Sequence, residues 1–206
     1  MVKYRTAFHV RLSTAKNSLI SYFFDIFFCL VAFSSFFCKK KKFIVEFEII
    51  KIKQLSGKKA QIYSVILGQE DQSVFEQFLQ NNYSEYPTEI EDIVSKLKIM
   101  ATKTGAAEHF FKLNEGKPGD GVCALFDSPD KKLRIYCIRF ANIAIVVGGG
   151  GYKPKNIRAY QESSSLKKEA ETVVRISRII SEAIKNKDIH LDDNGFFLGN
   201  LKLKEE

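Results

Sequence analysis

Basic side chains with tyrosines among them are the groups in this sequence whose types are best suited to chemistry on a ligand. Guanidinium and ammonium groups bind phosphate, aromatic rings stack on bases, and a fixed positive charge stabilises the charge that develops on a cleaved phosphodiester. A solubilising surface would have the same composition, so composition alone leaves both interpretations open. The set comprises Lys112, Arg134, Arg139, Lys153, Lys155 and Arg158, with Tyr136, Tyr152 and Tyr160 among them.

The strand expected to carry Arg134 limits which of these groups can share a site. Residues 133–140 read LRIYCIRF, a run of β-branched and aromatic residues typical of a strand. Successive side chains of a strand point to opposite faces, so Arg134 and Tyr136 lie on one face and Arg139 on the other. All three can line one site only if a bulge interrupts the pleat.

Other kinds of catalytic site lack their residues. The sequence has no Ser/His/Asp signature and no paired histidines, and His109 and His190 stand alone, which favours a structural or exposed role. The carboxylates of Glu108, Glu115 and Asp120 could serve as acids, but acids in a solvated loop are the simpler interpretation. We therefore expect no metal at the site.

Glycine and cysteine patterns also argue against a cofactor. Residues 148–151 are four glycines, but the run lacks the Gly-Lys-Ser/Thr ending of a phosphate loop and leads into a Lys-Pro segment. The four cysteines form no C-x-x-C pair and no zinc spacing. Two of them fall in expected strands, where a buried free thiol is the usual role. The sequence thus predicts neither a cofactor nor a disulfide scaffold.

The positive charge of the chain is concentrated at its start. The 206 residues carry a formal net charge of +8, which suggests a polyanion or a membrane as partner. Residues 1–42 hold eight basic residues against the single acid Asp25, a net charge of +7, and the remaining residues are left with +1. Any affinity of residues 43–206 for a polyanion must therefore come from a local cluster.

Residues 19–38, LISYFFDIFFCLVAFSSFFC, allow three interpretations. Their length and the four lysines that follow suit a membrane anchor, although Asp25 in mid-span costs about 2.5–3.5 kcal/mol. A signal peptide is the second option, but no small-residue cleavage site precedes the lysines. We prefer the third, in which residues 1–42, rich in Phe and Lys, are a translated non-coding leader and the native chain starts at Val45. A cytoplasmic location follows, with a membrane anchor through residues 19–38 as the alternative.

The pattern after residue 42 predicts a small α+β domain over residues 43–189, followed by a tail or small hairpin at 190–206. Strands are expected at residues 43–53, 60–67, 110–113, 122–126, 133–140 and 143–147, and helices at 71–81, 88–104 and 165–187. Thr88 and Glu91 suggest a capping box at the start of the second helix. We expect an antiparallel sheet with the helical hairpin and the C-terminal helix on one face, and a glycine loop that brings residues 152–158 to the sheet edge.

Three segments in this order resemble the RelE/ParE superfamily of toxins. They are FFKLNEGKPGDGVCALFD (residues 110–127), LRIYCIRF (133–140) and VVGGGGYKPK (146–155). The resemblance covers about residues 45–187 and is strongest to the HigB-like and phage-derived members. It implies a RelE-like sheet and a toxin of a type II toxin–antitoxin system. Such toxins cut ribosome-bound mRNA by attack of a 2′-OH on the adjacent phosphate, without a metal.

The resemblance also implies roles for individual residues. Arg134 matches the central-strand arginine that stabilises the transition state, Lys112 a basic residue of an inner strand, and Tyr160 a C-terminal tyrosine; we expect these three to be catalytic. Substrate would be bound by Lys153 and Lys155, the basic residues after the last strand. The basic set adds Arg139, Arg158 and Tyr136 to the substrate-binding residues.

Two departures from the family pattern bear on activity. Residues 122–126 form an extra strand, and the helix after the basic segment is longer than in many members. The implied partners are a helix-turn-helix antitoxin, mRNA and the ribosome, with a membrane only if residues 1–42 are genuine. The alternative is a non-catalytic binding module of the same fold, such as a topoisomerase inhibitor or a phage-derived regulatory protein.

Overall fold

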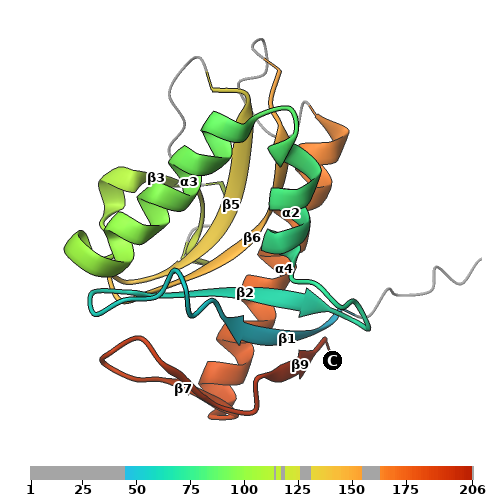
Figure 1. Ribbon diagram of the computed structural model, residues 1–206. Coiled ribbons are helices and arrows are strands. Elements are labelled where there is room, and N and C mark those ends of the chain that lie inside the picture. The colour runs from blue at the N-terminus through green and yellow to red at the C-terminus, as the bar shows by residue number, and fades with distance from the viewer. Residues whose placement is uncertain (1–44, 114, 117–118, 126–130, 155–162, 206) are drawn as a thin grey trace, which may run out of the picture. The chain divides into compact units, whose positions relative to one another are not determined.

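Two stretches rich in β-branched residues form a hairpin, two helices and a meander of strands follow it, and a long helix and three short strands end the chain (Figure 1). The computed structural model describes residues 45–113, 115–116, 119–125, 131–154 and 163–205, so the interpretations of residues 1–42 lie outside it. The helices are α2 (Val74–Tyr83), α3 (Pro87–Ile99) and α4 (Ser164–Asn186), with a π-helical turn η1 (Met100–Thr104) and a 3-10 turn η2 (Glu108–Phe110). The strands are β1 (Glu46–Lys51), β2 (Gln61–Leu67), β3 (Phe111–Leu113), β4 (Val122–Leu125), β5 (Leu133–Phe140), β6 (Ala144–Tyr152), β7 (Ile189–Leu191), β8 (Phe197–Gly199) and β9 (Lys202–Lys204).

The main sheet has seven strands in the order β3-β4-β5-β6-β2-β1-β9. Its neighbours are antiparallel except β2 and β6, which pair in parallel between residues 61–63 and 144–146. The α+β class is thus confirmed, whereas an entirely antiparallel sheet is wrong at this one pair. The pattern of apolar residues within a strand fixes its buried face but not the direction of its neighbour.

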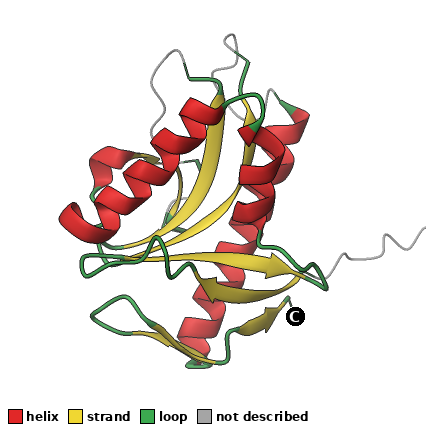
Figure 2. Ribbon diagram, in the orientation of Figure 1, coloured by secondary structure: helices red, strands yellow, loops and turns green. Residues whose placement is uncertain are grey.

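Helices cover both faces of the sheet (Figure 2). One core holds apolar residues of α2 and α3 against residues such as Ile135 and Cys137 of β5. The other core holds the apolar side of α4 against Tyr136 and Ile138 of the same strand. The expectation that the helical hairpin and the C-terminal helix lie on one face of the sheet is therefore wrong. Each strand of the centre must bury both sets of its side chains, which is why β5 is apolar at nearly every position.

The helix starts differ from those expected. Ser73 caps α2 and forms a reciprocal capping box with Glu76, a signal that the sequence contains three residues apart. α3 begins at Pro87 after Tyr86 and has no side-chain cap, so the expected capping box of Thr88 and Glu91 is wrong. Proline suits this first helical position because it has no amide hydrogen to leave unpaired.

The four glycines form part of β6 and are not a loop. Residues 148–151 pair with β5, and the register shifts so that Ile135 faces Gly150 while Cys137 faces Val147. The extra residue lies on β6, which makes a β-bulge there. A Cβ atom at Gly148 would overlap the Val173 side chain of α4. The glycines therefore let α4 lie close against the strand.

The C-terminal strands complete the fold beside β1 and β2. β7 and β8 form a hairpin, and β9 pairs with β1 through Phe47 and Leu203. The Tyr63 hydroxyl donates to the Gly195 carbonyl at 3.1 Å and accepts from the Phe197 amide at 3.2 Å, which ties the hairpin to β2. Among the helices of the described residues, none has the length and apolar character needed to cross a bilayer.

Candidate nucleic-acid interface

Arg134 lies on the face of the sheet that α4 covers. Its neighbours Leu133 and Ile135 belong to the core beneath α2 and α3, so the pleat directs Arg134 to the opposite side. Its side chain is only 3% exposed, and its Nη1 lies 3.5 Å from Oε1 of Glu115. A buried guanidinium is costly to desolvate, and the Glu115 carboxylate offsets part of that cost.

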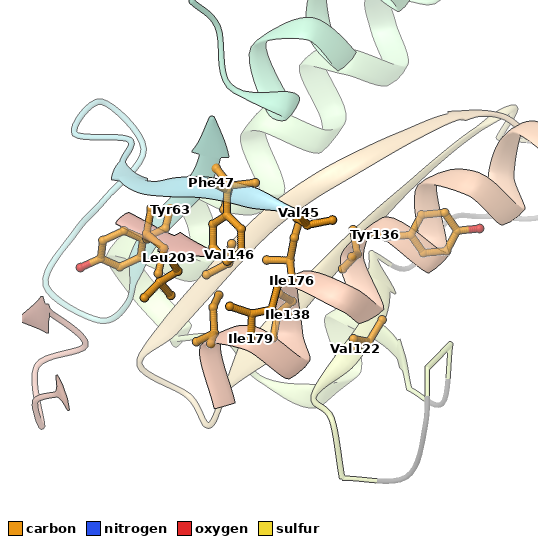
Figure 3. Packing of buried hydrophobic residues seen from close by; sticks show 14 of the residues in the cluster. Val45, Phe47, Tyr63, Val122, Tyr136, Ile138, Val146, Ile176, Ile179 and Leu203 are labelled. Atoms are coloured by element: carbon orange, nitrogen blue, oxygen red, sulfur yellow. The ribbon is translucent and has the colours of Figure 1, made fainter. Parts of the chain in front are cut away.

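Tyr136 and Lys112 share this face with Arg134. Lys112 of β3 is opposite Ala124 of β4, and Ala124 is opposite Tyr136 of β5. Directly paired residues of neighbouring strands project from the same face, so these two side chains start about 10 Å apart, two strand spacings. Figure 3 shows the Tyr136 ring beside the coil of α4 and in one layer with Ile138, and the ring is buried.

Lys153 extends the same group from the end of β6. Its amide donates to the Lys132 carbonyl at 2.6 Å, and its side chain is buried. A Cβ atom at Gly151 would face Leu166 of α4. Residues two apart in a strand point to the same face, so Lys153 is directed to the α4 face as well. The structure thus brings together Lys112, Arg134 and Tyr136, with Lys153 at the margin.

Arg139 points to the opposite face, as the pleat of its strand predicted. Its Nε donates to the Ala106 carbonyl at 2.6 Å, and its Nη1 lies 3.3 Å from the Glu108 carboxylate. The only register shift of the β5–β6 pair places the extra residue on β6, so the alternation of β5 is unbroken. Arg139 does not join the group around Arg134. The remaining expected site residues, Lys155, Arg158 and Tyr160, lie outside the described residues.

The two described cysteines, Cys123 and Cys137, are buried opposite each other on β4 and β5. Burial raises the pKa of the Cys123 thiol to about 12 and raises that of Cys137 well above its usual value. Thiols with such pKa values stay protonated at neutral pH and are poor nucleophiles. Within the part of the chain that the structure describes, no three His, Cys, Asp or Glu side chains gather as a metal site would require.

A groove of about 400 Å³ lies along the glycines of β6, between α2 and α4. Its lining includes Gly149–Gly151, Asn81, Asn82 and Glu169. Burial raises the pKa of Glu169, and the neighbouring Lys168 lowers it by a smaller amount. No signal in the sequence marks this groove, because Glu169 reads as one more acid on the polar side of a helix.

A second hollow, of about 530 Å³, was also missed. It is lined by three lysines and an aromatic ring, Lys51, Lys53, Lys58 and Phe196. The three lysines are close together in the sequence, at the end of β1 and in the turn that follows it. Phe196, in contrast, belongs to the C-terminal hairpin. Nothing in the sequence pattern links these two segments, so only the fold reveals the site.

Comparison of the chain with protein-family models, with curated proteins and with solved structures gives no match.

Proposed function

We propose that this protein is the toxin of a type II toxin–antitoxin system and a metal-independent endonuclease of ribosome-associated mRNA. The observation that carries the proposal is the meeting of Lys112, Arg134 and Tyr136 on one face of the sheet. Lys112 comes from β3, whereas Arg134 and Tyr136 both come from β5. Two cationic groups and a phenol are what a metal-free site needs to hold a phosphodiester and stabilise its charge.

The order of elements supports a RelE-like arrangement. β2 leads into the helical hairpin of α2 and α3, and the antiparallel strands β3 to β6 follow. The last of these strands returns beside β2, and α4 then packs on the face that carries Arg134. This is the succession of strand, two helices, strands and helix on which the resemblance to RelE/ParE toxins was based. The finer family assignment is part of the proposal.

Glu115 gives the proposed reaction a proton acceptor. In the cleavage, the 2′ oxygen forms a bond to phosphorus, the bond from phosphorus to the 5′ oxygen breaks, and the 2′ proton must leave. Arg134 is buried and paired with Glu115, so a phosphate that binds the guanidinium competes with that carboxylate. The displaced Glu115 then accepts the 2′ proton, Arg134 stabilises the charged phosphorus centre, and Lys112 donates a proton to the leaving 5′ oxygen.

The proposed partners follow from this activity. They are mRNA on the ribosome as substrate and a helix-turn-helix protein as antitoxin. The setting is the cytoplasm, with a membrane involved only if residues 19–38 form an anchor. The nearest test of the pairing is the neighbouring reading frame, where a small helix-turn-helix protein is expected.

The nuclease is tested by removing the Arg134–Glu115 pair as a unit. In Arg134→Gln/Glu115→Gln both charges go together, which avoids leaving a buried carboxylate unpaired. Induction of this double variant or of Lys112→Ala should no longer arrest growth or cleave ribosome-bound mRNA, as measured by primer extension. Arg178→Gln is the control, since Arg178 is half exposed and pairs with Glu205 near the C-terminus. Full cleavage by a folded double variant would exclude Arg134 from the mechanism.

A non-catalytic binding module of the same fold is the second candidate, and the burial of Arg134 favours it. A guanidinium that is 3% exposed and ion-paired has the features of a structural group. Under this alternative, growth arrest persists while mRNA stays intact, and the double variant remains toxic whenever it folds. A supercoiling assay with purified topoisomerase then identifies the inhibited target.

A further inference from the structure

The turn between β1 and β2 and the turn between β7 and β8 enclose a hollow that is separate from the Arg134 group. Figure 1 shows both turns on the left of the molecule, one below the other. We call this hollow of about 530 Å³ the basic hollow; its lining includes Lys51, Lys53, Lys58, Gln61, Asn194 and Phe196. Its size is within the range of pockets that hold a nucleotide-sized group.

The positive charge of the basic hollow is not neutralised by ion pairs. No residue that lines it is acidic. Within the described ranges, Lys51, Lys53 and Lys58 form no ion pair with an acid, although basic residues elsewhere do, such as Lys131 with Asp92. Three unpaired ammonium groups around one concave surface create a positive potential that attracts phosphate.

Asp192, one of the two acids in the β7–β8 turn, accepts hydrogen bonds within that turn. Its Oδ1 accepts hydrogen bonds from the amides of Asn194 at 2.9 Å and Phe196 at 2.7 Å. The carboxylate therefore shapes the turn that presents Asn194 and Phe196. Its charge is partly satisfied by these amide donors, which leaves the lysines as the charged groups that line the hollow.

An aromatic ring stands beside the lysines. The Nζ atom of Lys51 lies 4.2 Å from the centroid of the Phe196 ring, a cation–π contact that holds the ammonium group in place. The ring is 37% exposed, unlike that of its neighbour Phe197, which is buried against Tyr63. An exposed ring next to ammonium groups is the combination that binds single-stranded nucleic acid without sequence preference.

Hydrogen bonds from one side chain and one backbone amide hold the walls of the hollow in position. Gln61 Nε2 donates to the Gly57 carbonyl at 2.7 Å, and the Lys59 amide donates to the Ala101 carbonyl at 2.8 Å. On the other side, Gly195 fits against the Ile143 carbonyl with a positive φ of 81°, a conformation that favours glycine. The hollow is thus preformed, which lowers the entropy lost when a ligand binds.

We propose that the basic hollow binds the backbone of single-stranded RNA, with Lys53 and Lys58 on phosphates and Phe196 stacked on a base. The choice of RNA as the nucleic acid rests on the proposed function. The hollow adjoins the β5–β6 turn, because Gln61 donates to the Ile143 carbonyl. Arg134 lies six residues up β5 from Phe140, about 20 Å away at the rise of a strand. The hollow therefore holds a part of the RNA several nucleotides from the bond that is cut.

Fluorescence anisotropy with the full chain tests this inference. The probe is a fluorescein-labelled 12-nucleotide RNA with 2′-O-methyl sugars, which cannot be cleaved, titrated at several KCl concentrations. Counterion release predicts that Lys53→Gln/Lys58→Gln lowers the magnitude of the slope of log K against log salt by about 1.4, or about 25-fold weaker binding at 0.1 M. Phe196→Leu should weaken binding at least about fivefold through lost stacking.

Lys98→Gln/Lys185→Gln is the matched control, because it removes two exposed lysines that do not line the hollow. This control should bind RNA almost as tightly as the wild type, with only the small loss that comes from a lower overall positive charge. An unchanged slope in Lys53→Gln/Lys58→Gln, or an equal loss in the control, would overturn the inference. The readout is independent of cleavage. If Arg134→Gln/Glu115→Gln loses cleavage but the hollow variants bind RNA like the wild type, only the proposal for the hollow fails. If the hollow variants lose binding but Arg134→Gln/Glu115→Gln still cleaves, only the proposal for the nuclease fails.

Discussion

Gly148→Ala should destabilise the protein because α4 lies too close to β6 for a side chain there. A Cβ atom built on Gly148 overlaps Cγ2 of Val173 and lies 3.2 Å from the carbonyl oxygen of Tyr136. Val173 is 1% exposed and packed in the core beneath α4, so it has no free space to move into. Forcing a methyl group into such a core costs about 1–3 kcal/mol.

Gly151→Ala is the matched control within the same glycine run. A Cβ atom there has its nearest neighbour, Leu166 Cδ2, at 4.0 Å, an ordinary contact. The residue has no positive φ, so alanine fits its conformation and lowers the entropy of the unfolded chain. We expect this variant to be unchanged or more stable by about 0.4–1 kcal/mol.

Urea denaturation followed by circular dichroism measures both free energies of unfolding. For a domain of this size, the loss in Gly148→Ala corresponds to a Tm lower by about 2–12 °C. If Gly148→Ala unfolds at the wild-type urea concentration, α4 does not approach the strand as closely as described. Equal losses in both variants would show that the cost comes from the glycine run in general and not from contact with α4.

Two further substitutions test other parts of the fold. Tyr63→Phe should lower the free energy of unfolding by about 1–3 kcal/mol, because the Gly195 carbonyl and the Phe197 amide both lose their buried partner; a wild-type Tm would contradict the anchoring of the hairpin. Glu169→Gln tests the half-buried acid that lines the groove along the glycines of β6. Burial raises the pKa of Glu169 in the folded protein, so its contribution to stability is present at low pH and is lost as pH rises through that raised pKa. The gain in urea midpoint of Glu169→Gln over wild type should therefore grow from about pH 4 to pH 8 and vanish at the acid end; a gain that does not vary with pH would contradict it.

Local patterns predicted the elements but not how they pair. The apolar spacing of Leu166, Ala170 and Val173 indicated the inward side of α4, and the structure buries all three. The same pattern could not say which face of the sheet α4 would cover. The glycines of β6 let the helix approach that face, because added Cβ atoms at Gly148 and Gly149 would meet α4. The parallel pairing of β2 with β6, whose residues lie about eighty positions apart, is likewise invisible in a local pattern.

The glycine run was misjudged because glycine is usually depleted in strands. Glycine is needed at Gly148 and Gly149 because α4 packs on the strand there, and added Cβ atoms would meet Val173 and Glu169 of that helix. A glycine that a strand needs because a helix packs closely on it does not itself indicate a strand in the sequence. The position of Arg139, in contrast, depended only on the pleat of its own strand and was predicted correctly.

The candidate site was predictable to a similar extent. Arg134 and Tyr136 share a face by simple alternation, but the pairing of Arg134 with Glu115 requires a loop to fold back onto β5. The basic hollow needed even more, since Phe196 comes from a segment that the sequence left open as a tail or a small hairpin, with no sign that it lies beside the lysines. Contacts between segments far apart in the chain are set by the whole fold, which a single sequence does not display.

The contrast between the two basic groups sets an order of events for RNA binding. Lys53 and Lys58 are exposed and unpaired among the described residues, so their field reaches into solvent and attracts a polyanion before contact. Arg134 is buried and its charge is opposed by Glu115, so it exerts little attraction at a distance. RNA should therefore bind first at the hollow and engage Arg134 afterwards, when a phosphate displaces the carboxylate. On this basis the rate of association should depend strongly on salt through the hollow, whereas the rate of the later step should depend on the Arg134–Glu115 pair and little on salt.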